Sequence, residues 1–132
     1  MRRTAVLLGL IAAAACADAT APDLTPYAGN YTLRTINGGP LPYAVLQAPD
    51  VKLEITADTI VLTTNGRFAD LTHYRRARST GIDFPADTLN GAWTVRGQTI
   101  TFTAQAGDIF SGTITGTTFS LVGNATTSVY AR

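Results

Sequence analysis

The segment from Arg67 to Arg78 carries the side chains best suited to hold a ligand. Its alternation is typical of a β-strand, in which side chains two residues apart point to the same face. If Phe68 faces the interior of the fold, Tyr74, Arg76 and Arg78 share that face. Guanidinium groups pair with carboxylates and phosphates through two parallel hydrogen bonds. These three side chains therefore predict a clamp for an anionic group.

The same segment permits a second interpretation, in which the strand extends past the rim of the fold and its arginines are solvated. Their partners would then be Asp70, Asp83 or Asp87. Because an unpaired guanidinium group is costly to bury, this interpretation is favoured over the clamp.

Catalysis would need residues that the chain does not offer in a recognisable setting. His73, the only histidine, lies on the opposite face of the same strand, and no Gly-x-Ser-x-Gly elbow accompanies it. One histidine and one cysteine build neither a multi-histidine metal site nor a disulfide. The sequence therefore predicts no enzymatic activity, no cofactor and no metal. Trp93 could stack on a ligand, although a tryptophan that alternates with Val95 is more typical of a core residue.

The N-terminal segment predicts export. Arg2 and Arg3 precede an apolar run over residues 5–12, three alanines at 13–15, and Cys16, the only cysteine. The apolar run is too short to cross a hydrocarbon layer of about 30 Å, which is typical of a signal peptide.

The approach to Cys16 resembles the lipobox of bacterial lipoproteins, with Ala13 where leucine is usual. This resemblance implies that residues 1–15 are removed and that Cys16 carries acyl chains such as palmitate, which anchor the protein to a membrane of the cell envelope. Ala17 in place of aspartate implies the outer membrane. The alternative is an ordinary signal peptide that is cleaved after Ala15.

The rest of the chain divides into a linker and one domain. Residues 16–26 are small, polar and interrupted by prolines, which is typical of a flexible linker, and residues 27–132 form the predicted domain. Removal of residues 1–15 would leave eight basic and nine acidic residues. This near-neutral balance argues against a nucleic-acid partner.

The domain is predicted to be all-β, because threonine, valine, isoleucine and aromatic residues alternate with polar ones and no helical period is present. Asn65 and Gly66 predict a type I′ hairpin. Residues 55–62, 94–102 and 113–121 predict three further hairpins of one design, and residues 37–50 and 79–90 are read as long loops. The predicted strands are 29–36, 51–56, 59–64, 67–78, 91–96, 98–104, 108–115, 117–122 and 127–131.

Eight or nine strands in an antiparallel meander would expose one apolar face and two unpaired edges. Closure into a small barrel of about eight strands removes both problems. Residues 27–42 and 129–132 resemble small bacterial lipoproteins described as lipocalin-like. In lipocalin-type barrels an arginine of the last strand packs on the aromatic residue of a Gly-x-Trp motif. The resemblance implies that Gly29, Tyr31 and Arg132 close the barrel in this way, with tyrosine in place of tryptophan.

The sequence favours a lipid-anchored protein that binds a small hydrophobic or amphipathic ligand in or near the mouth of the barrel, and one observation separates this function from its alternative. A cavity lined by Phe68, Tyr74, Trp93 and Phe102 would favour a carrier of a small hydrophobic or amphipathic ligand. A closed core would favour a structural or protein-interaction module of the envelope, for example an inhibitor-like barrel.

Overall fold

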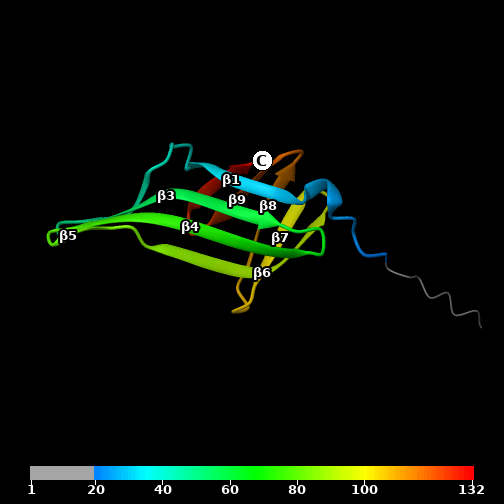
Figure 1. Ribbon diagram of the computed structural model, residues 1–132. Helices are drawn as coiled ribbons and strands as arrows, with labels where there is room; N and C mark the ends of the chain where they lie inside the picture. The colour runs from blue at the N-terminus through cyan, green and yellow to red at the C-terminus, as the bar shows by residue number, and fades with distance from the viewer. Residues whose placement is uncertain (1–19) are drawn as a thin grey trace, which may run out of the picture.

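The computed structural model describes residues 20–132, which fold as an all-β domain (Figure 1). The predicted signal peptide and Cys16 lie outside the described residues. A short 3-10 helix, η1 (Thr25–Tyr27), precedes the strands. These are β1 (Gly29–Ile36), β2 (Tyr43–Ala48), β3 (Val51–Leu62), β4 (Arg67–Arg78), β5 (Gly81–Asp83), β6 (Ala86–Arg96), β7 (Thr99–Ala104), β8 (Ile109–Thr115), β9 (Thr118–Gly123) and β10 (Thr126–Ala131).

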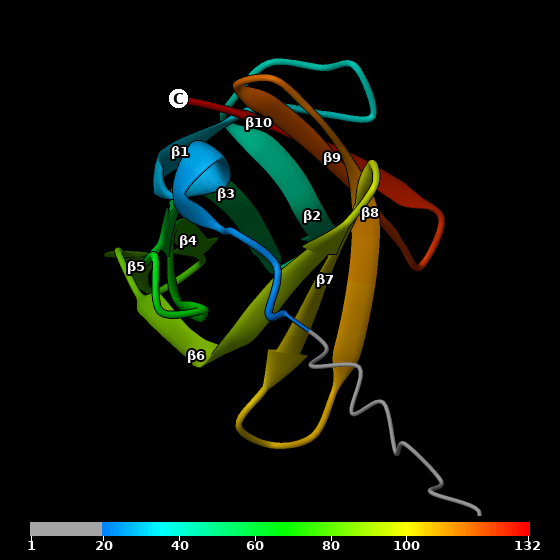
Figure 2. The same ribbon diagram turned by 90° about the vertical axis from the view of Figure 1, so that its right-hand side faces the viewer.

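Eight of these strands close into an antiparallel barrel, as the sequence predicts. β1, β3, β4, β6, β7, β8, β9 and β10 each pair with the next, and β10 returns to β1 with Leu33 opposite Tyr130. The ring of strands is seen end-on in Figure 2. This meander is consistent with the lipocalin-like barrel that the sequence resemblance implied, and each strand of the ring has hydrogen-bonded neighbours on both sides.

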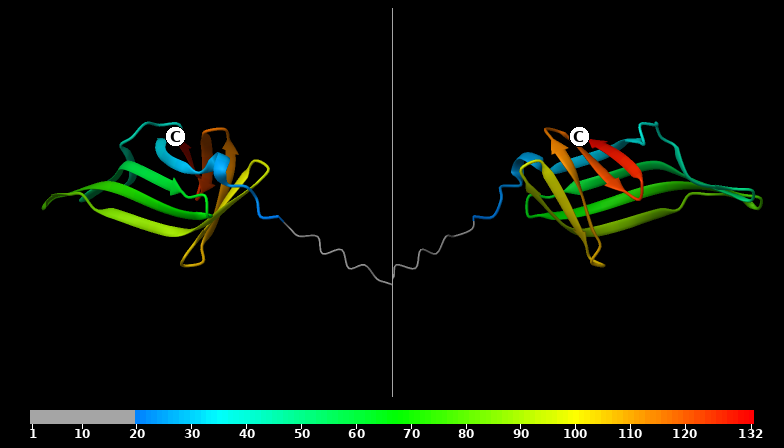
Figure 3. Two further views of the ribbon diagram at one scale, coloured as in Figure 1. Left: turned by 45° about the vertical axis from the view of Figure 1, so that its right-hand side comes forward. Right: turned by 180° about the vertical axis from the view of Figure 1, so that it is seen from behind.

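β3 and β4 continue well beyond the barrel. Residues 59–62 of β3 pair with β1, whereas residues 51–55 pair with β2; on β4, residues 67–73 pair with β6 and residues 76–78 with β5. Residues 43–55 and 74–83 thus form a four-stranded sheet, here called the tip sheet. It projects from the end of the barrel opposite η1 (Figures 1 and 3).

The connections differ from the sequence prediction in three places. The expected loop 37–50 contains β2, and the expected loop 79–90 contains β5 and the first half of β6. Residues 51–62 form one strand rather than a hairpin, because the irregularity near Thr56 is a register shift between Ile55 and Ala57 and not a turn. Between β3 and β4, Gly66 has a positive φ of 78° but Asn65 does not, so the turn is not of type I′.

Aromatic and aliphatic side chains fill the barrel. Phe102 and Phe119 are fully buried, and six aromatic pairs link the rings of the core, with centroid separations of 4.8–6.1 Å. Gly112 of β8 allows the backbone of β9 to approach closely, because a Cβ atom at that position would lie 1.7 Å from the carbonyl oxygen of Ser120. The buried core consists of Tyr31, Leu33, Ile36, Ile60, Leu62, Phe68, Trp93, Val95, Ile100, Phe102, Ile114, Phe119 and Tyr130.

Candidate functional site

Three residues, Gly29, Tyr31 and Arg132, meet at the η1 end of the barrel. The guanidinium carbon of Arg132 lies 5.6 Å from the centroid of the buried Tyr31 ring, a cation–π distance. The same guanidinium donates hydrogen bonds to the carbonyl oxygens of Ala28 at 2.5 Å and Pro26 at 2.7 Å. Gly29 has a φ of +149°, and a Cβ atom there would lie 3.3 Å from the Arg132 side chain. The structure therefore brings Gly29, Tyr31 and Arg132 together.

Trp93 and its neighbours Phe68 and Phe102 belong to the buried core. Trp93 is 3% exposed, and its indole Nε1 donates to the carbonyl oxygen of Thr63 at 3.1 Å. Phe68 and Phe102 pack edge to face at 5.2 Å. Of the four side chains that were considered as the lining of a cavity, three are buried in the core, and the fourth, Tyr74, is only partly buried.

The predicted anion clamp is spread along β4. Arg76 donates from both Nε and Nη2 to the carboxylate of Asp83 on β5. Its guanidinium group is therefore already paired with a carboxylate of the same chain. Arg78 lies further out, opposite Val51, and is exposed. Tyr74 stands opposite Ile55, nearer the barrel. Arg76 thus has one of the acidic partners considered in the solvated interpretation, and the three side chains do not converge on one point.

The Arg76–Asp83 pair also governs the ionisation of both groups. Asp83 raises the pKa of Arg76, and Arg76 lowers the pKa of Asp83. His73 is exposed, on the opposite face of β4, where its backbone pairs with Ala57 and Ala86.

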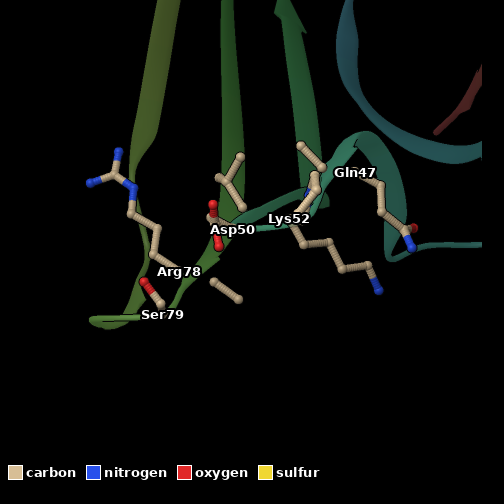
Figure 4. Close-up of a pocket in the computed structure, with 9 residues that line it drawn as sticks. Gln47, Asp50, Lys52, Arg78 and Ser79 are labelled. Atoms are coloured by element: carbon tan, nitrogen blue, oxygen red, sulfur yellow. The ribbon is translucent and has the colours of Figure 1, made fainter.

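An open depression lies at the far end of the tip sheet, with a volume of about 290 Å³. Gln47, Asp50, Lys52, Arg78 and Ser79 line it (Figure 4). The side chains of Arg78 and Lys52 point away from each other there. Two cations that diverge in this way do not hold one anion between them.

Glu54 ties the tip sheet together on the face that carries Lys52. Its carboxylate lies 2.7 Å from Nζ of Lys52 and 2.9 Å from a guanidinium nitrogen of Arg75. Hydrogen bonds from these two partners lower the pKa of Glu54, and they also cover it, since the residue is only 7% exposed. This network was not predicted from the sequence, because it depends on the pairing of residues 21 positions apart.

A second buried polar group lies within the barrel, on the side of the tip sheet. Asp58 of β3 is 5% exposed, and its Oδ2 accepts a hydrogen bond of 2.8 Å from the hydroxyl of Tyr130. Asp70 of β4 interacts with Asp58, and burial together with this neighbour raises the pKa of Asp70 to about 8. Burial and Asp58 also raise the pKa of Tyr130.

From the sequence, Asp70 was considered as a partner for an arginine, and Asp58 falls between the predicted strands 51–56 and 59–64. The alternation of Asp58 with Ile60 and Leu62 is the signal that places its side chain on the inward face.

The tip sheet exposes apolar side chains near its two edges. Val45 is 46% and Leu46 48% exposed on β2, Ile82 on β5 is 55% exposed, and Phe84 directly after β5 is 73% exposed. Large exposed apolar side chains such as these are candidates for contact with another molecule.

The two edges of the tip sheet differ in chemistry. The free edge along β5 and the start of β6 carries Asp83, Pro85 and Asp87, residue types that oppose pairing with another strand. β2, residues 43–48, pairs only with β3 and carries neither a charge nor a proline. Apart from a register shift between Ala44 and Leu46, the edge of β2 carries none of the features that oppose pairing, and it remains the edge that is open to a further strand.

Within residues 20–132, no group of three or more histidine, cysteine, aspartate or glutamate side chains is placed to hold a metal ion. The same part of the chain contains no helix that is long and apolar enough to cross a membrane. No family model matches the sequence, and no curated protein matches it either.

Proposed function

We propose that this protein is a lipid-anchored module of the bacterial cell envelope that binds a protein partner through its tip sheet. The observation that carries the proposal is the extension of β3 and β4 past a barrel that is already closed. The extension recruits β2 and β5 and exposes apolar side chains, which a barrel of eight strands does not need for its own stability.

The filled interior supports an interaction module over a carrier of small ligands. Phe102 and Phe119 are fully buried and pack against other rings, and the depression of about 290 Å³ lies outside the barrel. A carrier would need concave apolar space between these side chains.

The position of the tip sheet suits contact with a partner away from the membrane. The described chain begins at Thr20, on the η1 side, whereas β5 lies at the opposite end of the molecule (Figure 1). Eight residues lie between Cys16 and η1, and a chain of this length spans at most about 30 Å. An anchor at Cys16 would therefore keep the η1 end near the membrane and direct the tip sheet away from it.

The mode of binding follows from the edge of β2. We propose that an extended, predominantly apolar segment of the partner adds to β2 as a further strand. Backbone hydrogen bonds would supply affinity, and contacts with Val45 and Leu46 would supply specificity. The absence of charge on β2 makes this mode favourable for an apolar segment.

The anchor itself rests on the sequence of residues 1–16. Acylation of Cys16 would hold the protein in the envelope, and Ala17 points to the outer membrane by resemblance to lipoprotein sorting. Radiolabelled palmitate tests this part of the proposal. Wild-type protein should take up label in growing cells, whereas Cys16→Ser should not, and equal labelling of the two would contradict acylation at this residue.

Site-specific photo-cross-linking in intact cells tests the tip sheet. A photoreactive residue in place of Leu46 should give a discrete adduct with another protein. The matched control is the same residue in place of Val122, which is also exposed, at 64%, but lies on β9 of the barrel wall. Adducts from both positions, or from neither, would contradict the proposal.

A lysine on the edge separates strand addition from a looser contact. With the photoreactive residue at Val45, Leu46→Lys should abolish the adduct, because a charged edge opposes pairing. An adduct that survives Leu46→Lys would leave a partner on the tip sheet but overturn strand addition as the mode.

A further inference from the structure

The acidic pair Asp58–Asp70 is not used by the proposed function and has an unusual geometry. Asp58 stands opposite Thr72, and Asp70 stands opposite Ile60, so the two aspartates are diagonal neighbours on adjacent strands. The Oδ1 atoms of both are buried and have no hydrogen-bond donor within residues 20–132. Two carboxylates in this position repel each other, and desolvation adds to the cost.

Within residues 20–132, no cationic side chain contributes to the raised pKa of Asp70. Tyr130 of β10 donates its hydroxyl to Asp58. Burial raises the pKa of Tyr74 of β4, and the carboxylates of Asp87 on β6, Asp58 and Asp70 raise it further. Burial and the neighbouring Asp58 are the causes that raise the pKa of Asp70.

We infer that Asp58 and Asp70 share one proton, which fastens β3 to β4 inside the barrel and is released as the pH rises. A protonated carboxyl on one residue donates to the free oxygen of the other, so a single proton satisfies both orphan atoms and removes one charge. The strands are held while the proton is present, and its loss leaves two negative charges side by side.

The sign of the effect follows from the proton balance. Aspartate in an unfolded chain loses its proton near pH 4, whereas Asp70 in the folded protein keeps one up to about pH 8. Between these values the folded state binds one proton more than the unfolded state. Stability therefore falls as the pH rises across this interval and levels off above it.

The location gives the pair a role at the base of the tip sheet. Asp58 follows directly after the register shift between Ile55 and Ala57, which is where β3 leaves the barrel. The shared proton would thus keep β3 and β4 together at the base of the tip sheet at acidic and neutral pH. Loss of the proton under alkaline conditions would weaken the contact between the two strands there. The inference does not depend on the identity of any partner.

Urea denaturation of the full chain at several pH values tests the inference. For the wild-type protein, the equilibrium constant for unfolding should rise by about tenfold per pH unit between pH 5 and 7. Asp70→Asn preserves the shape and carries an amide that donates to Asp58 at every pH. This variant should lose the tenfold dependence, and Asp87→Asn should keep it as the matched control.

If the equilibrium constant for unfolding depends on pH equally in the wild type and in Asp70→Asn, the inference is overturned. Carbon NMR of the side-chain carboxyls in the wild-type chain decides the matter if the variant does not fold. One carboxyl of the pair should titrate near pH 8, whereas titration of both below pH 5 would show that no proton is shared. A divalent cation that removes the pH dependence of the wild type at stoichiometric concentration would likewise assign the site to a metal and overturn the inference.

Discussion

Phe102 offers a sharp test of whether the barrel is filled. The residue is fully buried, and its ring centroid lies 5.2 Å from that of Phe68, 5.0 Å from Phe110 and 5.8 Å from Phe119. Phe102→Ala removes the ring at which these three contacts meet. The loss of buried area and the cavity left behind act together, and substitutions of this kind cost about 3–5 kcal/mol.

Urea denaturation measures this cost against a control of the same chemistry. Phe84 is 73% exposed, so Phe84→Ala should change the free energy of unfolding by no more than about 0.5 kcal/mol. The denaturation midpoint of Phe102→Ala should fall while the slope of the transition stays unchanged, since the two states still differ by nearly the same surface area.

The cavity in Phe102→Ala supplies a second readout. An apolar cavity of this kind stays dry and binds small apolar molecules such as benzene. The variant should therefore gain stability on addition of benzene, and the wild-type protein should not. Stabilisation of the wild type by benzene, or a cost of Phe102→Ala below about 1 kcal/mol, would show that the barrel is hollow and would refute the packing argument.

Three further substitutions test the contacts described above. Tyr130→Phe should lower the free energy of unfolding by about 1–3 kcal/mol in urea denaturation, because Asp58 loses its hydroxyl donor; an unchanged midpoint would count against that hydrogen bond. Arg132→Ala should raise the rate of amide hydrogen exchange in the η1 turn and around Tyr31 but not in β6. An equal rise in all strands would show that Arg132 does not act locally on the η1 end. The lowered pKa of Glu54 means that its contribution is present above its ordinary pKa and is lost as the pH falls through the lowered value. Protection factors of β2 amides should therefore drop between pH 5 and pH 3 in the wild type and be independent of pH over that range in Glu54→Gln.

The sequence predicted strands where alternation is unbroken. The bounds 29–36 and 67–78 agree with β1 and β4, and closure of the meander followed from the count of strands. β2 was missed because proline and glycine residues surround it and Ala44, Val45 and Leu46 do not alternate with polar side chains. Local pattern thus identified the barrel and missed the edge that now carries the proposed function.

The candidate site was less predictable because it depends on contacts between strands. Spacing placed Tyr74, Arg76 and Arg78 on one face of β4 and allowed both a clamp inside the barrel and a strand that extends past the rim. The register of β4 with β3 and β5 places Arg76 and Arg78 beyond the rim. The pairing of Arg76 with Asp83 depends on β5, which was expected to be a loop. The meeting of Asp58 with Asp70 required the register between β3 and β4, which a register shift alters by one residue.

Native mass spectrometry of the full-length protein, extracted from the envelope in mild detergent without denaturation, tests the central claim most directly. A filled barrel that works through protein contacts predicts the mass of the processed chain with its acyl groups, alone or with a protein partner, and no further small molecule. A small hydrophobic or amphipathic molecule that stays bound to the folded barrel and is released on unfolding would contradict the account and establish a ligand carrier.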